Sequence, residues 1–234
     1  VTSMTDNSGA LREQRSYYQA RASEYDEWWL RRGRYDRGAE LNEQWFSETA
    51  AVANAVDEFR PAGRILELAC GTGFWSERLL PYASELVLLD GSSEMLGLAS
   101  GRLQSPKVRC IDEDIFSWHS TERFDTIFFG FWLSHVPPDR FEEFWKLVRQ
   151  SLAAEGRVFF VDSLYEESST AADQRLPGSE TTTLKRRLND GREFRIYKVF
   201  YEQGRLRDRL LELGWRFRLS RTNRHFLYGD GAHV

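Results

Sequence analysis

A glycine-containing turn follows the first strongly apolar run of the chain. In ILELACGTGFW the apolar residues end at Ala69, and Gly71-Thr72-Gly73 form a turn before residues that favour a helix. Glycine suits a turn where a ligand lies close to the backbone or where φ is positive, because a Cβ makes both costly. The pattern predicts a loop that holds a nucleoside-containing ligand, although a tight β–α turn without a ligand has the same appearance.

Three acidic residues lie where the first three predicted strands end. Glu67 is near the end of the first, Asp90 ends the second, 17 residues after Gly73, and Asp114 follows the third. The carboxyl ends of parallel strands share one edge of a sheet, so Asp90 is expected beside the glycine turn, where it can accept hydrogen bonds from ribose hydroxyls. Asp114, next to apolar Ile115, suits an adenine amino group. Glu67 suits a cationic ligand, or is a solvated strand end.

One histidine follows the fourth predicted strand, in FFGFWLSHVPP. This position presents side chains to the reacting centre in open α/β sheets. A neutral imidazole near pH 7 can remove a proton from a hydroxyl group, so His135 is the candidate general base. The alternative is a packing role for His135 at the start of the following helix.

A parallel sheet is needed to bring these residues together. Short runs rich in β-formers alternate with helical runs, which is typical of βαβ units, and several runs are apolar enough to be buried on both faces. The predicted fold class is therefore α/β with a doubly wound, mostly parallel sheet. The expected strands are residues 64–69, 85–90, 107–111, 124–130 and 157–162, and the expected helices between them are residues 74–82, 92–103 and 138–153.

The remaining segments flank this core. Residues 1–9 are small and polar and are predicted to be a disordered lead, and residues 10–60 are predicted to be a helical cap. After the core at residues 61–163, an Asn-Asp-Gly turn between two β-forming runs predicts a hairpin, and a helix closed by Gly214 precedes a last β-rich run. Residues 164–234 are thus expected to form a lid loop, this hairpin and a terminal helix and strand, within the same domain.

Composition argues against several function classes. The 234 residues carry a net charge of −4, so bulk electrostatics predict neither nucleic acid nor an anionic membrane as a partner. No apolar run reaches the ~20 residues that span a bilayer, and the N-terminal segment has no secretory pattern, so a cytoplasmic protein is expected. Cys70 and Cys110, predicted on strands two spacings apart, are expected to be free thiols. No metal site is predicted.

Together these motifs resemble the class I S-adenosylmethionine-dependent methyltransferases, in their small-molecule branch. The resemblance covers about residues 17–228 and implies a seven-stranded Rossmann-like sheet with a C-terminal antiparallel hairpin, with S-adenosylmethionine as cofactor and S-adenosylhomocysteine as product. The segment YYQARASEYDEWW is similar to the family's variable cap, YYxxRAxxYD, which packs over the cofactor. The glycine loop is implied to hold the methionine portion, Asp90 the ribose, and Asp114 with Ile115 the adenine. The implied cofactor-binding residues are Tyr18, Tyr25, Glu67, Gly71, Thr72, Gly73, Asp90, Gly91, Ser92, Met95, Asp114, Ile115 and Phe131.

The resemblance leaves the acceptor open. Methyltransferases of base or amide nitrogens usually carry Asn/Asp-Pro-Pro-aromatic where this chain has Gly-Phe-Trp-Leu at residues 130–133, so the oxygen of a phenol, alcohol or carboxylate in secondary or quinone-type metabolism is preferred. Nitrogen and carbon acceptors remain alternatives. Aromatic walls favour a partly apolar small molecule, and the arginines of the predicted hairpin suit a substrate carboxylate or phosphate. The candidate substrate-binding residues are Trp29, Trp132, Arg192 and Arg195.

Two other function classes are retained as alternatives. A nicotinamide-dependent oxidoreductase has the same kind of fold, but its fingerprint needs a third glycine or alanine where this chain has Ser76, after bulky Phe74 and Trp75. A binding or regulatory protein would keep the cofactor pocket without turnover. Both a monomer and a homodimer are compatible with the sequence.

Overall fold

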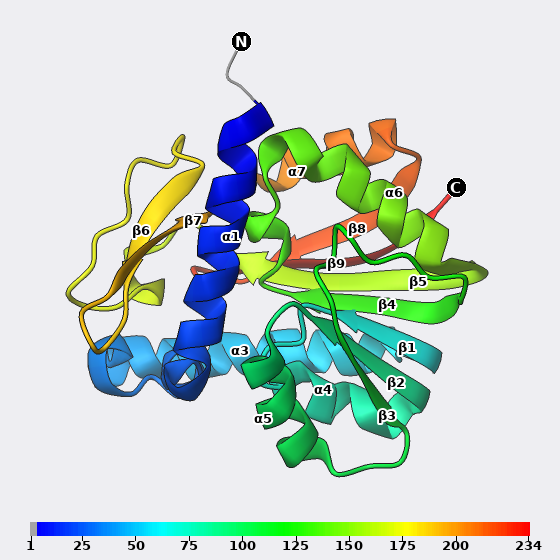
Figure 1. The fold of residues 1–234 in the computed structure, drawn as a ribbon, viewed down its shortest axis with the longest axis horizontal. Coiled ribbons are helices and arrows are strands. Elements are labelled where there is room, and N and C mark those ends of the chain that lie inside the picture. The colour runs from blue at the N-terminus through cyan, green and yellow to red at the C-terminus, as the bar shows by residue number, and fades with distance from the viewer. Residues whose placement is uncertain (1–3) are drawn as a thin grey trace.

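A seven-stranded sheet forms the centre of the molecule (Figure 1). The computed structural model describes residues 4–234, and its strand order is β3-β2-β1-β4-β5-β9-β8. Strands β1 to β5 are parallel, and β9 pairs antiparallel with both β5 and β8. The mostly parallel sheet with a C-terminal antiparallel strand pair is therefore confirmed. The strands are β1 (Gly63–Leu68), β2 (Ala83–Asp90), β3 (Val108–Asp112), β4 (Phe124–Gly130), β5 (Leu152–Ser163), β8 (Trp215–Arg221) and β9 (Phe226–His233).

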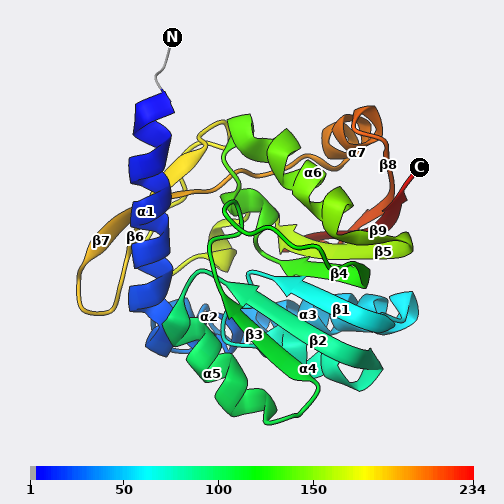
Figure 2. The ribbon, with the colours of Figure 1, turned by 45° about the vertical axis from the view of Figure 1, so that its right-hand side comes forward.

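Helices cover both faces of this sheet (Figures 1 and 2). Apolar side chains alternate along β1, with Ile65 in the core beneath one helical layer and Leu66 in the core beneath the other. A parallel sheet needs such cover on both faces, because its strands are apolar on both sides. One layer contains α3 (Ala39–Phe59), α4 (Phe74–Leu79) and α5 (Ser93–Leu103), and the other contains α6 (Phe141–Ser151) and α7 (Gln203–Glu212).

Residues at the helix ends explain where α5 begins and where α7 ends. The Ser92 hydroxyl accepts a hydrogen bond from the Met95 backbone N–H (3.3 Å) at the start of α5. This bond satisfies one of the donors that a helix leaves free at its N-terminus. Ser92, two positions after Asp90, is thereby held at the edge of the sheet where ligands are expected. At the other end of the chain, α7 stops before Gly214, whose φ is +80°.

A cap lies across the carboxyl ends of the central strands (Figure 2). Its main element is α1 (Met4–Arg21), which packs along β7 of a separate two-stranded sheet. That sheet consists of β6 (Thr183–Arg187) and β7 (Glu193–Tyr197), joined through the predicted Asn-Asp-Gly turn. A short helix, α2 (Asp26–Trp29), leads the chain from α1 towards α3.

Several boundaries differ from the sequence predictions. The first helix begins at Met4, so residues 4–9 are helical where a disordered lead is predicted, and residues 1–3 of that prediction lie outside the described residues. The last parallel strand begins at Leu152, which pairs with Phe124, and is longer than predicted. Cys110 is exposed within β3 rather than at its end, and both cysteines are free thiols as predicted. No helix in the described part of the chain is long and apolar enough to cross a membrane.

Candidate active site

A cavity lies at the carboxyl ends of β1, β2 and β4, with α1 along one side. The strand order reverses between β1 and β4, and the crevice at such a reversal is where open α/β sheets bind ligands. Five wall residues were absent from the sequence predictions: Leu11, Gln14, Arg15, Ala69 and Gly130. The predicted residues in the wall are Tyr18, Tyr25, Gly71, Asp90, Gly91, Ser92, Met95, Asp114, Ile115, Phe131, Trp132 and His135.

The Asp90 carboxylate organises the strand ends at this cavity. One oxygen accepts a hydrogen bond from the Gly71 backbone N–H and the other from the Ser92 backbone N–H, both at 2.9 Å. Burial raises the pKa of Asp90 to about 6, although both hydrogen bonds act to lower it. Gly71 has a φ of +56°, and a Cβ there would lie 3.8 Å from the Tyr25 ring. The glycine loop thus holds a carboxylate that is largely ionised at neutral pH and still has lone pairs to offer.

Three of the predicted cofactor residues lie behind the cavity wall instead of in it. Glu67 is buried, accepts a hydrogen bond from Ser76 Oγ at 2.5 Å, and has its pKa raised to about 8 by burial. It is therefore mostly protonated at neutral pH, which removes the basis for expecting a counter-ion there. The Thr72 hydroxyl donates to Asp26 at 2.6 Å and ties the loop to α2. Gly73 has a φ of +82°, and a Cβ would come within 3.0 Å of Ala99, so this glycine allows α5 to pack closely.

A second cavity adjoins the first. Tyr18, Tyr25, Phe131 and His135 belong to the walls of both. Among the side chains that the structure describes, no Asp or Glu lines this second cavity. Its other wall residues are Arg21, Trp28, Tyr35, Ser163, Ser169, Thr170, Leu176, Arg186, Ile196, Lys198 and Phe200.

Three cationic side chains give the second cavity its positive charge. Arg21 is 8% exposed, donates to the Tyr35 hydroxyl (3.2 Å), and has a buried Nε without a hydrogen-bond partner. Arg186 donates to the Thr170 hydroxyl. Neither guanidinium forms an ion pair with a carboxylate in the described part of the chain.

Lys198 is buried as well, but its charge is partly compensated. Its Nζ lies 2.8 Å from Ser134 Oγ, 3.2 Å from Ser163 Oγ and 3.4 Å from Asp162 Oδ1. Burial lowers the pKa of Lys198, and Asp162 opposes this shift. The unpaired positive charge of the cavity therefore comes mainly from Arg21 and Arg186.

The hydrogen bonds of His135 define its tautomer. Nδ1 lies 2.6 Å from the Tyr197 carbonyl oxygen, which can only accept, so Nδ1 carries the proton. Nε2 is then an acceptor, and the Tyr18 hydroxyl donates to it at 2.7 Å. Burial and the nearby Lys198 ammonium hold the pKa of His135 well below its ordinary value. His135 is a neutral acceptor that is already occupied by Tyr18.

The predicted substrate-binding residues divide between the cavity and other places. Trp132 lines the first cavity. Trp29 instead lies in the core, where it stacks on Phe74 with ring centroids 4.3 Å apart. Arg192 and Arg195 are exposed on the outer side of the hairpin. The former is paired with Asp190 at 2.7 Å, and neither lines a cavity wall described above.

Strand alternation explains why Arg195 lies outside the two cavities while Arg186 lines one of them. Lys185 pairs across the hairpin with Arg195, and both are exposed. Successive side chains of a strand point to opposite faces, so Arg186 and Ile196 point inward. Lys198, two positions after Ile196, continues the inward face. This alternation of side chains can be read from the sequence, and it predicts that Arg186 and Lys198 point inward.

Known proteins share this arrangement. Residues 65–156 match the family model of the methyltransferase domain. Two structures of the protein DhpI, one described as a complex with SAH and one as a complex with SAM and HEP, are each 36% identical to this chain. They cover 96% and 99% of this chain and 97% and 100% of the DhpI chains, with TM-scores of 0.76 and 0.78.

A second relative matches over a shorter stretch. The malonyl-[acyl-carrier protein] O-methyltransferase 1 of Ilyobacter polytropus is 30% identical over 101 residues. These residues are 40% of this chain and 38% of that enzyme.

The buried Glu67 carboxyl predicts a pH-dependent stability. Its pKa is raised from 4.5 to about 8 in the folded state, so the stabilisation from its bound proton is full below pH 4.5 and is lost as pH rises through 8. Glu67→Gln stays neutral and removes this loss. Relative to the wild type, its free energy of unfolding should rise by up to about 1.4 kcal/mol per pH unit across that window.

Urea denaturation at pH 5, 6.5 and 8 measures this difference. Glu77→Gln, which alters a half-exposed glutamate on the same helix as Ser76, is the matched control and should show no such trend. A constant offset between Glu67→Gln and the wild type at all three pH values would show that Glu67 is ionised in the folded protein.

Proposed function

We propose a reaction for this chain from the premise that it belongs to the class I S-adenosylmethionine-dependent methyltransferases. Its cofactor is S-adenosylmethionine, and S-adenosylhomocysteine is the product. The reaction is the transfer of the methyl group to an anionic oxygen, of a carboxylate or phosphoryl group, on a small molecule in the cytoplasm. The observation that carries the proposal is the cationic second cavity beside the strand-end cavity. The family assignment removes the oxidoreductase alternative.

The residues of the first cavity suit the cofactor. When bound, S-adenosylmethionine supplies a methyl group on a positively charged sulfur. Asp90 can accept hydrogen bonds from ribose hydroxyls with the lone pairs that its two backbone bonds leave free. Asp114 and Ile115 offer an acceptor and an apolar surface to the adenine. The Tyr25 ring next to Gly71 can attract a sulfonium through its quadrupole.

An anionic acceptor offsets the cost of the buried positive charge. A charged group taken out of water without a partner is strongly unfavourable. Arg21 and Arg186 have neutral partners and no carboxylate partner in the described structure, so a substrate oxyanion would supply the missing negative charge. Guanidinium groups also match the planar geometry of carboxylate and phosphoryl oxygens. The Ilyobacter polytropus relative is an O-methyltransferase, which supports oxygen as the acceptor atom.

The protein's own contribution is placement and exclusion of water. An acceptor oxyanion held by the arginines would lie beside the wall that the two cavities share, close to the transferable methyl group. Holding the two reactants within van der Waals contact accounts for much of the acceleration in such a displacement. An oxygen that is already anionic needs no base. His135 then acts as a positioning residue, since its Nε2 holds the Tyr18 hydroxyl and through it the end of α1.

A neutral alcohol or phenol is the second candidate acceptor. It would need His135 as general base, as the sequence predicts. In this structure Nε2 already accepts from Tyr18, and the surrounding cations oppose protonation of the ring. The alcohol reaction would thus require Tyr18 to leave His135 first. Amine and carbon acceptors gain nothing from the arginines and are less favoured.

Removal of Arg186 tests the anion proposal. Arg186→Met keeps the length and apolar stem of the side chain but removes its charge. We expect the KM for anionic acceptors to rise by about tenfold or more, because charge-assisted hydrogen bonds contribute about 1.5–3 kcal/mol. The rate of S-adenosylhomocysteine release is measured over a panel of carboxylic and phosphonic acids with their neutral amides and esters.

Arg195→Met, on the outer side of the same hairpin, is the matched control and should behave like the wild type. Equal turnover of the acids and their neutral analogues by the wild-type protein would contradict an anionic acceptor.

His135→Ala distinguishes positioning from base catalysis. With an anionic acceptor, we expect turnover to fall less than about tenfold. A general base would instead cost about 10²–10⁴ in kcat. Steady-state rates of the two proteins with a saturating acceptor, with circular dichroism as a check of folding, decide between the two roles.

A further inference from the structure

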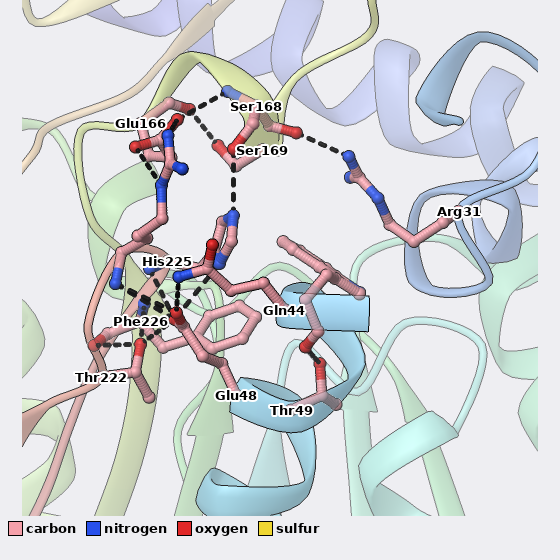
Figure 3. Close-up of polar contacts among 12 residues, drawn as sticks. Arg31, Gln44, Glu48, Thr49, Glu166, Ser168, Ser169, Thr222, His225 and Phe226 are labelled. Atoms are coloured by element: carbon pink, nitrogen blue, oxygen red, sulfur yellow. Dashed lines mark hydrogen bonds and ion pairs between the residues drawn. The ribbon is translucent and has the colours of Figure 1, made fainter. Parts of the chain in front are cut away.

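A buried polar cluster joins α3, the segment after β5 and the turn before β9 (Figure 3). Its centre is Glu48 on α3, which is 7% exposed. The carboxylate accepts hydrogen bonds from the Thr222 hydroxyl and from the backbone N–H groups of Arg224 (3.2 Å) and His225 (2.9 Å). Burial raises the pKa of Glu48, but these bonds hold it below its ordinary value, so Glu48 is an anion.

The His225 imidazole connects Glu48 to the segment that follows β5. His225 is 1% exposed, with Nδ1 3.2 Å from Glu48 Oε2 and Nε2 3.0 Å from Ser168 Oγ. The Nδ1 contact with Glu48 lies within ion-pair distance but lacks hydrogen-bond geometry. Because a carboxylate can only accept, this contact favours the tautomer with the proton on Nδ1, in which Nε2 accepts from the Ser168 hydroxyl. Burial lowers the pKa of His225, which keeps the ring neutral and preserves this direction of hydrogen bonding.

Ser168 is the fixed point of a segment that reaches the second cavity. Its backbone carbonyl accepts from Arg31 Nη2 at 2.6 Å, and the next carbonyl, of Ser169, accepts from Trp28 Nε1 at 2.7 Å. Ser169 and Thr170 line the cavity, whereas Ser168 itself is only 3% exposed. The Thr170 hydroxyl accepts the hydrogen bond from Arg186.

The resemblance of this cluster to a Ser-His-Glu triad does not make Ser168 a nucleophile. Such a nucleophile must be presented to a substrate, and here the cavity wall is formed by its two neighbours instead. The chain of contacts runs from Glu48 through His225 to Ser168. Two residues further along the backbone, the Thr170 hydroxyl contacts the Arg186 guanidinium. The cluster therefore ends on a side chain of the acceptor cavity.

We propose that Glu48 and His225 are positioning residues for acceptor binding, because they hold Ser168 and through Thr170 orient the guanidinium of Arg186. The inference rests on the proposed function, in which Arg186 binds the acceptor anion. An arginine has many rotamers, and ordering it before the anion arrives removes part of the entropic cost of binding. The contribution of Glu48 and His225 is thus to the affinity of the second cavity and leaves the first unaffected.

Conservative changes at the end of the chain of contacts test this inference. Ser168→Ala removes the hydroxyl that His225 holds, and Thr170→Val removes the one that Arg186 contacts. We expect each to raise the Kd of inorganic phosphate, titrated into the protein saturated with S-adenosylhomocysteine, by about three- to tenfold. The Kd of S-adenosylhomocysteine should stay within about twofold of the wild type. Isothermal titration calorimetry measures both constants.

Coupling to Arg186 separates positioning from a general loss of stability. In the Arg186→Met background, Ser168→Ala should change the phosphate Kd by less than about twofold, since residues that act through one another are not additive. Ser151→Ala is the matched control: it removes another buried serine hydroxyl, bonded to the Leu147 carbonyl at 3.0 Å on α6, and should leave the phosphate Kd unchanged. Glu48→Gln should reproduce the effect of Ser168→Ala. If Glu48→Gln does not fold, Ser168→Ala and Thr170→Val test the positioning role by themselves.

The outcomes distinguish the inference from the proposed function. A phosphate Kd that Arg186→Met raises but Ser168→Ala and Thr170→Val leave unchanged overturns the positioning inference alone. Full additivity of Ser168→Ala and Arg186→Met does the same. A wild-type protein that binds no phosphate, or an Arg186→Met protein that binds it normally, overturns the anion cavity and with it the inference.

Discussion

Positive charge beside the strand-end cavity is the feature that links the other parts of this site. Two guanidinium groups, of Arg21 and Arg186, lie in a cavity without a carboxylate in its described wall, and their hydrogen-bond partners are neutral: the Tyr35 and Thr170 hydroxyls and the Gln174 side-chain amide. Tyrosine rings offer further compensation, since the Arg21 guanidinium lies 4.8 Å from the centroid of the Tyr25 ring. Burial, together with the nearby Lys198, Arg186 and Arg21 cations, holds the pKa of His135 well below its ordinary value and keeps the ring neutral. Each of these features is explained by a site prepared for an anion.

The helix α1 joins this charged cavity to the strand-end cavity. Gln14, which is buried, donates to the His135 carbonyl at 3.1 Å and accepts from the Tyr197 backbone N–H at 2.9 Å, so α1 is attached to the core and to the hairpin at once. One turn further along, Tyr18 contributes to both cavity walls. One helix therefore contributes to the walls of both cavities.

The sequence predicts the sheet and the strand-end residues well because both follow from local patterns. Apolar runs of strand length alternate with helices, and Asp90 and Gly71 are adjacent whenever the first two strands are parallel neighbours. The acceptor cavity is harder to predict, because it joins segments far apart in the chain. Glu67 illustrates the limit: its position was predicted, but its protonation depends on burial by α4, which no local pattern reports. The alternation of the hairpin strands predicts that Lys198 and Arg186 point inward. Arg21 lies on a helix among aromatic residues, where no comparable pattern marks it.

The central claim is that the methyl group goes to an anionic oxygen, and the identity of the atom bonded to that methyl group tests it most directly. S-adenosylmethionine labelled with ¹³C in its methyl group would be incubated with the protein and a mixture of small acids, amines, phenols and alcohols, and the product examined by carbon NMR. The account predicts a labelled methyl ester of a carboxylic, phosphonic or phosphoric acid. A labelled N-methyl or C-methyl product, or methyl ethers from the neutral hydroxyl compounds alone, would contradict it.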